Sequence, residues 1–133
     1  MGSKSDYLEL EILDHTFGKG SFTPPTIYVA LYTVTPTDAG GGTECTGGSY
    51  ARKVTAGADW NVAASGSISN ANDITFVEAT ASWGEVVAFG LFDALTVGNL
   101  LYWGAITTPK TIDNGDTAKF AGGTPGDIVV TED

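Results

Sequence analysis

Turn-forming residues recur along this chain at short intervals, and they limit the length of every secondary-structure element. Eighteen of the 133 residues are glycine, and turn signals return about every 8–12 residues. The segments between the turns are rich in Thr, Val, Ile and aromatic residues, which favour half-buried pleated surfaces. The predicted fold is therefore mainly β: an antiparallel β-sandwich or barrel-like domain of about eight strands with one N-terminal α-helix.

The clearest strand occupies residues 26–34 (TIYVALYTV). Ile27, Val29 and Leu31 point to one face, and the even-numbered positions, which include Tyr28 and Tyr32, point to the other. Both faces are partly apolar, which is typical of a strand inside a sandwich or at a subunit contact. Residues 35–49, dense in Gly, Thr and Asp, are expected to form a loop.

The other expected strands are shorter. They occupy residues 50–55, 60–64, 73–77, 85–93, 99–106, 109–112, 117–120 and 128–131. Residues 94–98 have the length of a hairpin loop. The Asn114-Gly115 pair favours a type I′ turn, because both central residues of that turn need positive φ. A second hairpin is therefore expected across residues 113–116.

Residues 5–17 are expected to form the N-terminal helix, although residues 8–12 (LELEI) also alternate with the period of a strand. Ser3 with Asp6 three residues later fits a capping box, and Gly18 supplies a C-terminal stop. These start and stop signals favour the helix over the strand.

The expected helix is apolar on two faces. Tyr7, Leu10, Leu13 and Phe17 form one stripe, and Leu8 and Ile12 lie on the opposite side. A helix of this kind is usually wedged between two surfaces, so one is expected to belong to this chain and the other to a neighbour. The candidate interface residues, with four aromatic residues from elsewhere, are Tyr7, Leu8, Leu10, Ile12, Leu13, Phe17, Tyr28, Tyr32, Trp60 and Trp83.

Trp60 and Trp83 are included because they flank expected loops, where an aromatic ring can stack on a sugar or on a protein partner. Core packing is the alternative for both rings, and the pattern favours it. Trp103 lies inside the apolar run NLLYWGAI, and it is expected in the core.

The charge balance excludes several classes of partner. Sixteen acids stand against six scattered bases, and the net charge of −10 would repel a phosphate backbone. No apolar run approaches the ~18–20 residues that span a bilayer, and the acidic first fourteen residues do not resemble a signal peptide. The single Cys45 excludes an internal disulfide, which is consistent with synthesis in a reducing cytoplasm. One domain covering residues 1–133 is expected.

Catalytic, cofactor-binding and metal-binding residues are all predicted to be absent. His15 is the only histidine and has no partner for a two-His metal site. No basic cluster surrounds Cys45 to lower the pKa of its thiol. The turns at 70–73 and 113–116 do not have EF-hand spacing, and they are interpreted as turn formers.

Carboxylates are numerous enough to suggest a glycosidase, which needs two acids facing each other across a cleft. The candidates in or near strands are Asp73, Glu78, Glu85 and Asp93. Solvated surface charge is the favoured interpretation, because close pairs arise by chance in so acidic a chain.

The order of several short segments resembles a known family. These segments are DYLELEILDH, YVALYTVTPTD, GGSYAR, DITFVEATASWG, GLFDA and NLLYWGAITTPKTIDNGDT. In this order they resemble small tailed-bacteriophage virion structural proteins, often labelled tail-fibre-like. The resemblance extends from about residue 6 to residue 117. The chain departs from the family pattern at residues 56–65 and 121–133.

This resemblance implies a non-enzymatic structural protein at the virion surface, made in the bacterial host cytoplasm and needing no cofactor. The absence of repeats and of a coiled coil favours a capsid decoration (cement) protein, a homo-oligomer, preferably a homotrimer, that binds the outside of the major capsid protein shell. The first alternative is a tail-fibre or receptor-binding module that contacts host glycan. A small cell-wall glycoside hydrolase is the third possibility.

Overall fold

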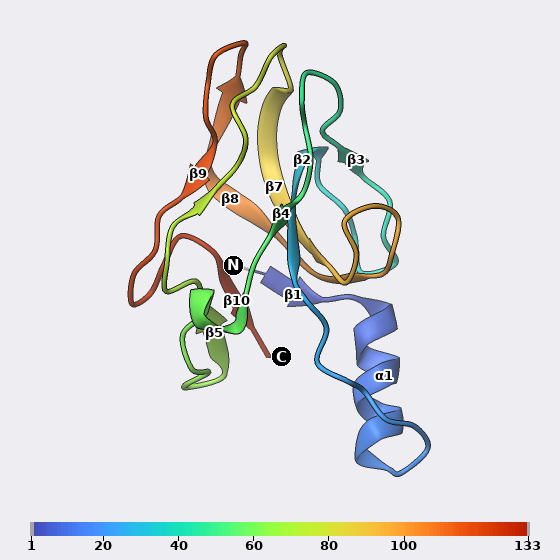
Figure 1. Cartoon of the computed structure of the whole chain (residues 1–133). Helices are drawn as coiled ribbons and strands as arrows, with labels where there is room; N and C mark the ends of the chain where they lie inside the picture. Colours follow the sequence, from blue (N-terminus) through green and yellow to red (C-terminus); the bar gives the residue numbers. More distant parts are fainter. Residues whose placement is uncertain (1, 133) are drawn as a thin grey trace.

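The computed structural model describes residues 2–132, and one large twisted sheet forms its centre (Figure 1). The strands are β1 (Gly2–Lys4), β2 (Tyr28–Val34), β3 (Thr43–Glu44), β4 (Lys53–Val54), β5 (Ser67–Ser69), β6 (Ile74–Thr75), β7 (Gly84–Phe92), β8 (Leu100–Ile112), β9 (Lys119–Phe120) and β10 (Val129–Thr131). The helices of the described chain are α1 (Asp6–Thr16) and the short 3-10 helix η1 (Gly57–Asp59). The order in the sheet is β3-β2-β7-β8-β1-β10-β5, with β4 also paired to β2, and β6 and β9 form a separate ribbon.

The predicted mainly β class, with about eight strands and an N-terminal helix, is confirmed. The barrel alternative is wrong, because the sheet is open and ends at β3 and at β5. The sheet is also mixed rather than purely antiparallel. Gly2 in β1 pairs in parallel with Val130 of β10 and antiparallel with Gly104 of β8. Strand β1, absent from the sequence-based expectation, therefore joins the two halves of the sheet.

Strand β2 buries both of its faces, as its alternation predicted. Val29 and Leu31 belong to the larger core cluster, and Ala30 and Tyr32 belong to a smaller one on the other face. Only the end of the strand departs from this pattern, since Val34 is exposed. The strand pairs with β3 and β4 on one side and with β7 on the other. It is therefore an interior strand.

The ribbon of β6 and β9 forms a second layer over the sheet. Phe120 of β9 packs edge-on against Phe89 of β7, with ring centroids 6.2 Å apart, and against Phe76 at 6.3 Å. Edge-to-face aromatic pairs add about 0.5–1.5 kcal/mol to the stabilisation from buried area. The larger core thus lies between the ribbon and the sheet, as in a sandwich.

The hairpin expected across residues 113–116 is wrong, and so is its type I′ turn, because Gly115 has positive φ but Asn114 does not. A turn of another type forms there. The Asp116 N–H donates to the carbonyl of Asp113 at 3.0 Å. Residues 109–112 continue β8, while β9 pairs with β6 through Ile74 and Phe120. The chain leaves β8 after the turn because burying Phe120 on the sheet requires it to cross to the second layer.

A strand at residues 60–64 is also not formed, since Trp60 makes only an isolated bridge to Asn70. Asn70 is fully buried, and its amide is satisfied by three backbone groups. Its nitrogen donates to the carbonyls of Asn72 and Ala121, and its oxygen accepts from the N–H of Ile128. The turn at residues 70–73 therefore also connects neighbouring segments, through the hydrogen bonds of the buried Asn70 amide.

Helix α1 begins one residue after its cap, Ser5. The Ser5 hydroxyl accepts the N–H of Leu8 at 3.2 Å and donates to the carbonyl of Leu100, which ties the helix start to β8. The capping box expected from Ser3 and Asp6 is wrong, because residues 2–4 are used as strand β1. Gly18 follows the helix with φ of +73°, as its expected role as a stop requires.

Beyond its first turn, α1 projects away from the sheet (Figure 1). The segment after it turns back, where His15 Nδ1 accepts the N–H of Phe22 at 3.2 Å. His15 therefore serves local structure at the end of the helix. In residues 2–132, no helix is both long and apolar enough to cross a membrane.

Candidate interaction surfaces

A cluster of charged side chains with several hydrogen bonds lies beside β2. Arg52 donates from Nε and Nη2 to the two carboxylate oxygens of Glu44, with both distances 2.9 Å. The Arg52 side chain is 7% exposed and that of Glu44 is 25% exposed. A two-pronged ion pair with this little solvent contact fixes both side chains in a single geometry.

Two aromatic residues extend this cluster into the core. Tyr50 donates to Glu44 Oε2 at 2.8 Å, and its hydroxyl accepts the N–H of Leu31 at 3.0 Å. Burial, and then the neighbouring carboxylate, raise the pKa of Tyr50 well above its ordinary value. Trp83 packs edge-on against the Tyr50 ring at 5.2 Å and donates from Nε1 to the carbonyl of Gly48 at 2.9 Å.

Arg52 also holds the loop between β7 and β8. Its Nη1 donates to the carbonyls of Ala94 and Val97, at 2.9 and 2.8 Å, and its guanidinium lies 3.7 Å over the Phe92 ring. All three guanidinium nitrogens of Arg52 and both carboxylate oxygens of Glu44 therefore have hydrogen-bond partners inside the chain. Sequence reasoning missed this pair, and the only signal for it was the segment GGSYAR, which supplies Tyr50 and Arg52.

The exposed face of α1 differs from this buried cluster, because its side chains are apolar and in contact with solvent. The helix advances about 100° per residue, so Leu10, Leu13 and Phe17 share one side and Leu8 lies on the other. Leu8 is 3% exposed and anchors the helix to the body, while Phe17 is 73% exposed and its two partners are also exposed. We call Leu10, Leu13 and Phe17 the α1 stripe.

Acidic residues surround the α1 stripe. Asp6, Glu9, Glu11 and Asp14 lie on the same helix, which contains no Lys or Arg. Around the helix axis, Glu9 and Asp14 flank the stripe on its two sides. The free helix thus presents an apolar patch with a negative rim.

Four of the ten candidate interface residues are brought together as exposed apolar side chains of α1. They are Leu10, Ile12, Leu13 and Phe17. Tyr7 is half-buried beside the helix start. It lines a groove of about 570 Å³ between α1 and the loops at residues 37–41 and 97–100.

The other candidates pack within the chain. Tyr32 stacks on Phe92 with ring centroids 6.5 Å apart, and half-buried Tyr28 packs against the same cluster. Trp60 is half-buried and donates from Nε1 to Thr55 Oγ1 at 3.0 Å. With Leu8 and Trp83, these side chains form part of the fold, so among the candidate interface residues only those of the helix leave large apolar side chains exposed.

Two of the four carboxylates considered for a glycosidase, those of Asp73 and Asp93, serve local structure. Asp93 accepts both the N–H and the amide NH₂ of Asn99, and so closes the β7–β8 loop. A hydrogen bond from the Gly122 N–H, and then the nearby Lys119 ammonium, lower the pKa of Asp73 below its ordinary value. A general acid in a glycosidase requires the opposite shift.

The thiol and the potential metal ligands give no reactive centre in the described residues. Cys45 is buried, and burial raises the pKa of its thiol to about 11. No group of three or more His, Cys, Asp or Glu side chains could hold a metal ion within residues 2–132.

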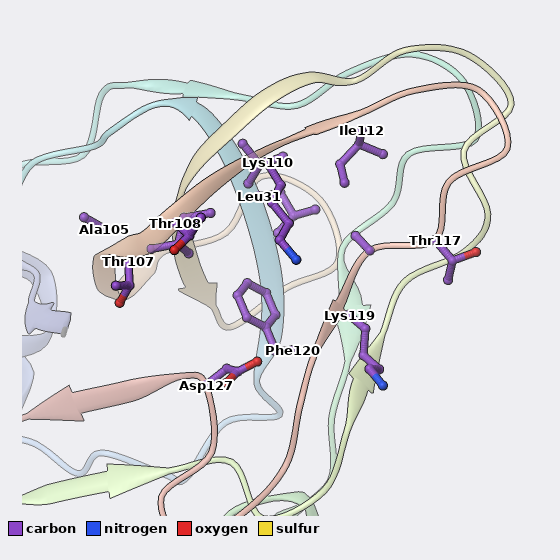
Figure 2. A pocket seen from close by; sticks show the side chains of 13 residues that line it. Leu31, Ala105, Thr107, Thr108, Lys110, Ile112, Thr117, Lys119, Phe120 and Asp127 are labelled. Carbon is purple, nitrogen blue, oxygen red and sulfur yellow. The ribbon is translucent and has the colours of Figure 1, made fainter.

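A cleft of about 650 Å³ lies between β8 and β9 (Figure 2). Its floor is apolar and consists of the buried side chains Leu31, Val86, Ile112 and Phe120. Its rim carries threonine hydroxyls and two exposed cations, Lys110 and Lys119, with the carboxylate of Asp127. We call this hollow the β8–β9 cleft. The sequence analysis did not identify it.

The chain is thus a β-rich domain, an open mixed sheet with a two-stranded cover, and it carries an apolar helix face at its surface. A family profile described as "Podophage GP4 fiber I protein gp80" matches residues 3–126. The chain belongs to this family, and it is a structural component of the phage virion, as its resemblance implied. No curated protein matches the sequence.

Proposed function

We propose that this chain is a non-enzymatic, self-associating subunit of a virion fibre assembly, and that α1 is its assembly element. The observation that carries the proposal is the α1 stripe, three large apolar side chains on a helix that projects from the body. The name of the matched family supports a fibre over a shell location.

The energetics favour a contact at this helix. Fully burying a Leu or Phe side chain contributes about 1.5–3 kcal/mol. Leu10, Leu13 and Phe17 are 64%, 53% and 73% exposed, so burying the exposed part of each would stabilise a contact, provided that their acidic neighbours also find partners. In the free chain this stabilisation is not realised.

Incorporation into particles tests the proposal. Virions assembled with the Leu13→Ser variant should contain much less of this protein than wild-type virions, as measured by quantitative blotting of purified particles. Val62→Ser is the matched control, because Val62 is an equally apolar, 91% exposed side chain far from α1 in the sequence. Equal incorporation of both variants would remove α1 from the assembly contact.

Capsid decoration is the second candidate. Its support is the charge of −10 on a compact chain without fibre repeats, since an acidic coat would suit a protein displayed on the shell beside the major capsid protein. Labelling with an antibody separates the two locations. Label at the fibres supports the proposal, whereas label over the head, with loss of heat resistance in particles that lack the protein, supports decoration.

A further inference from the structure

We infer that copies of this chain associate head to tail, with the α1 stripe of one copy seated in the β8–β9 cleft of the next. This inference rests on the proposed role of α1 in assembly and names its partner surface. It combines two features that the fold leaves without a match: an apolar patch with an acidic rim, and an apolar hollow whose rim carries two lysines and one carboxylate, that of Asp127.

The cleft has the chemistry that the helix requires. Its apolar floor can receive Leu and Phe side chains, and its volume of about 650 Å³ is in the range of pockets that enclose whole ligands. Two of the six basic residues in a strongly acidic chain, Lys110 and Lys119, stand at its rim. Among the described residues Lys110 makes no ion pair, and Lys119 has only a 3.7 Å contact with Asp73.

Like charge argues against the simplest alternative, in which α1 pairs with α1. A symmetric contact would bring the four acids of one helix close to the four acids of the other. Neither helix has a cation to offset this repulsion, which strengthens as the contact excludes water. The β8–β9 cleft offers the lysines Lys110 and Lys119 together with the apolar area, and its one carboxylate, Asp127, already accepts the N–H of Ala121.

The placement of the two surfaces requires the contact to be between molecules. In Figure 1, α1 and the β8–β9 region lie at opposite ends of the molecule. One chain therefore cannot fill its own cleft. Such a contact between unlike surfaces closes into a ring if its rotation permits, and otherwise continues as a filament. Either outcome gives a repeating subunit from one kind of contact.

Charge reversal in the purified chain tests the contact. We expect the wild-type protein to show concentration-dependent association by sedimentation, and Asp14→Lys or Lys110→Glu alone to weaken it more than about tenfold. The double variant Asp14→Lys/Lys110→Glu should recover most of the affinity, because the pair is restored with its signs exchanged. Lys53→Glu, at an exposed lysine of β4 outside the cleft, is the control for Lys110→Glu and should associate like the wild type.

A mixing experiment separates this geometry from a symmetric one. In the mixture, Asp14 of the Lys110→Glu chain can pair with Lys110 of the Asp14→Lys chain, and the two introduced charges can pair with each other. The mixture should therefore associate although neither variant does so alone. In a symmetric contact between α1 helices, the Lys110→Glu chain would associate without mixing. Association that is weakened by Asp14→Lys but unaffected by Lys110→Glu would overturn the assignment of the cleft.

A wild-type chain that stays monomeric at every concentration would overturn head-to-tail assembly itself. Loss of Leu13→Ser from virions would still support the role of α1 in that case, so the two proposals fail separately. Circular dichroism of each variant confirms that a loss of association does not come from unfolding.

Discussion

Strand β2 and helix α1 both carry apolar side chains on two faces, but the fold treats them differently. β2 has a strand on each side and a core cluster on each face. Helix α1 is anchored through Leu8 and its cap, and its other face is left in water. In the strand, two apolar faces indicate the interior of this chain. In the helix, one face contacts this chain, and we propose that another molecule covers the other face.

The largest expected effect comes from the buried side of this comparison. Phe89→Ala should lower the free energy of unfolding by about 3–5 kcal/mol, since it removes a ring that is 2% exposed and in contact with Phe120. Denaturant unfolding followed by tryptophan fluorescence measures this loss. A loss below about 1 kcal/mol would mean that the ribbon of β6 and β9 does not depend on this contact.

The buried ion pair should rank next. Arg52→Ala leaves Glu44 without its partner and frees two carbonyls of the β7–β8 loop, so we expect a loss of about 3 kcal/mol. The matched control is Lys53→Ala, the exposed neighbour in the chain, which should change stability by no more than about 0.5 kcal/mol. Equal effects of the two variants would show that the Arg52 network contributes little to folding.

Alkaline pH should lower the free energy of unfolding by a smaller amount than these two substitutions. The pKa of Tyr32 and that of Tyr102 are raised to about 12 from 10.0, and that of Cys45 is raised to about 11 from 9.0, in each case mainly by burial. The unfolded chain therefore loses these protons first, and stability should be complete below about pH 9 and fall as pH rises through 11 to 12.

Denaturation midpoints in a pH series measure this fall. Tyr102→Phe should flatten the upper part of the curve, because the variant lacks one of the groups whose pKa is raised. An unchanged slope in this variant would exclude Tyr102 as a contributor.

The smallest effect on stability is expected on the exposed face of α1. Phe17→Ala makes the same chemical change as Phe89→Ala, but at a 73% exposed side chain, and should shift the free energy of unfolding by no more than about 0.5 kcal/mol. Its effect should instead appear as weaker association in sedimentation. A large loss of stability in dilute monomer would show that α1 packs against its own chain.

Patterns in short stretches of sequence predicted the elements whose structure depends on residues close together in the chain. The alternation at residues 26–34 identified an interior strand. The stop signal at Gly18 correctly supported the helix, although the capping box expected at its start was wrong. Residues 2–4, in contrast, show no strand pattern of their own. They form β1 because backbone groups about a hundred residues away, at Gly104 and Val130, are positioned to pair with them.

The candidate site shows the same division. The apolar residues of α1 could be named from the sequence because they repeat along one helix. The β8–β9 cleft could not, since its floor joins Leu31 to Phe120, residues that only the tertiary fold brings together. The Arg52–Glu44 pair was hidden among many charges that appeared to be solvated.

The position of β1 has a consequence for how the chain reaches this structure during synthesis. Gly2 lies so close to its neighbours that an added Cβ would be 2.6 Å from Val130 Cγ1 and 2.9 Å from the Trp103 carbonyl oxygen. Residues 2–4 are thus enclosed by a strand that lies far later in the chain. Until residues 129–131 have been synthesised, β1 can pair only with β8. The sheet is therefore completed only after β10 has emerged.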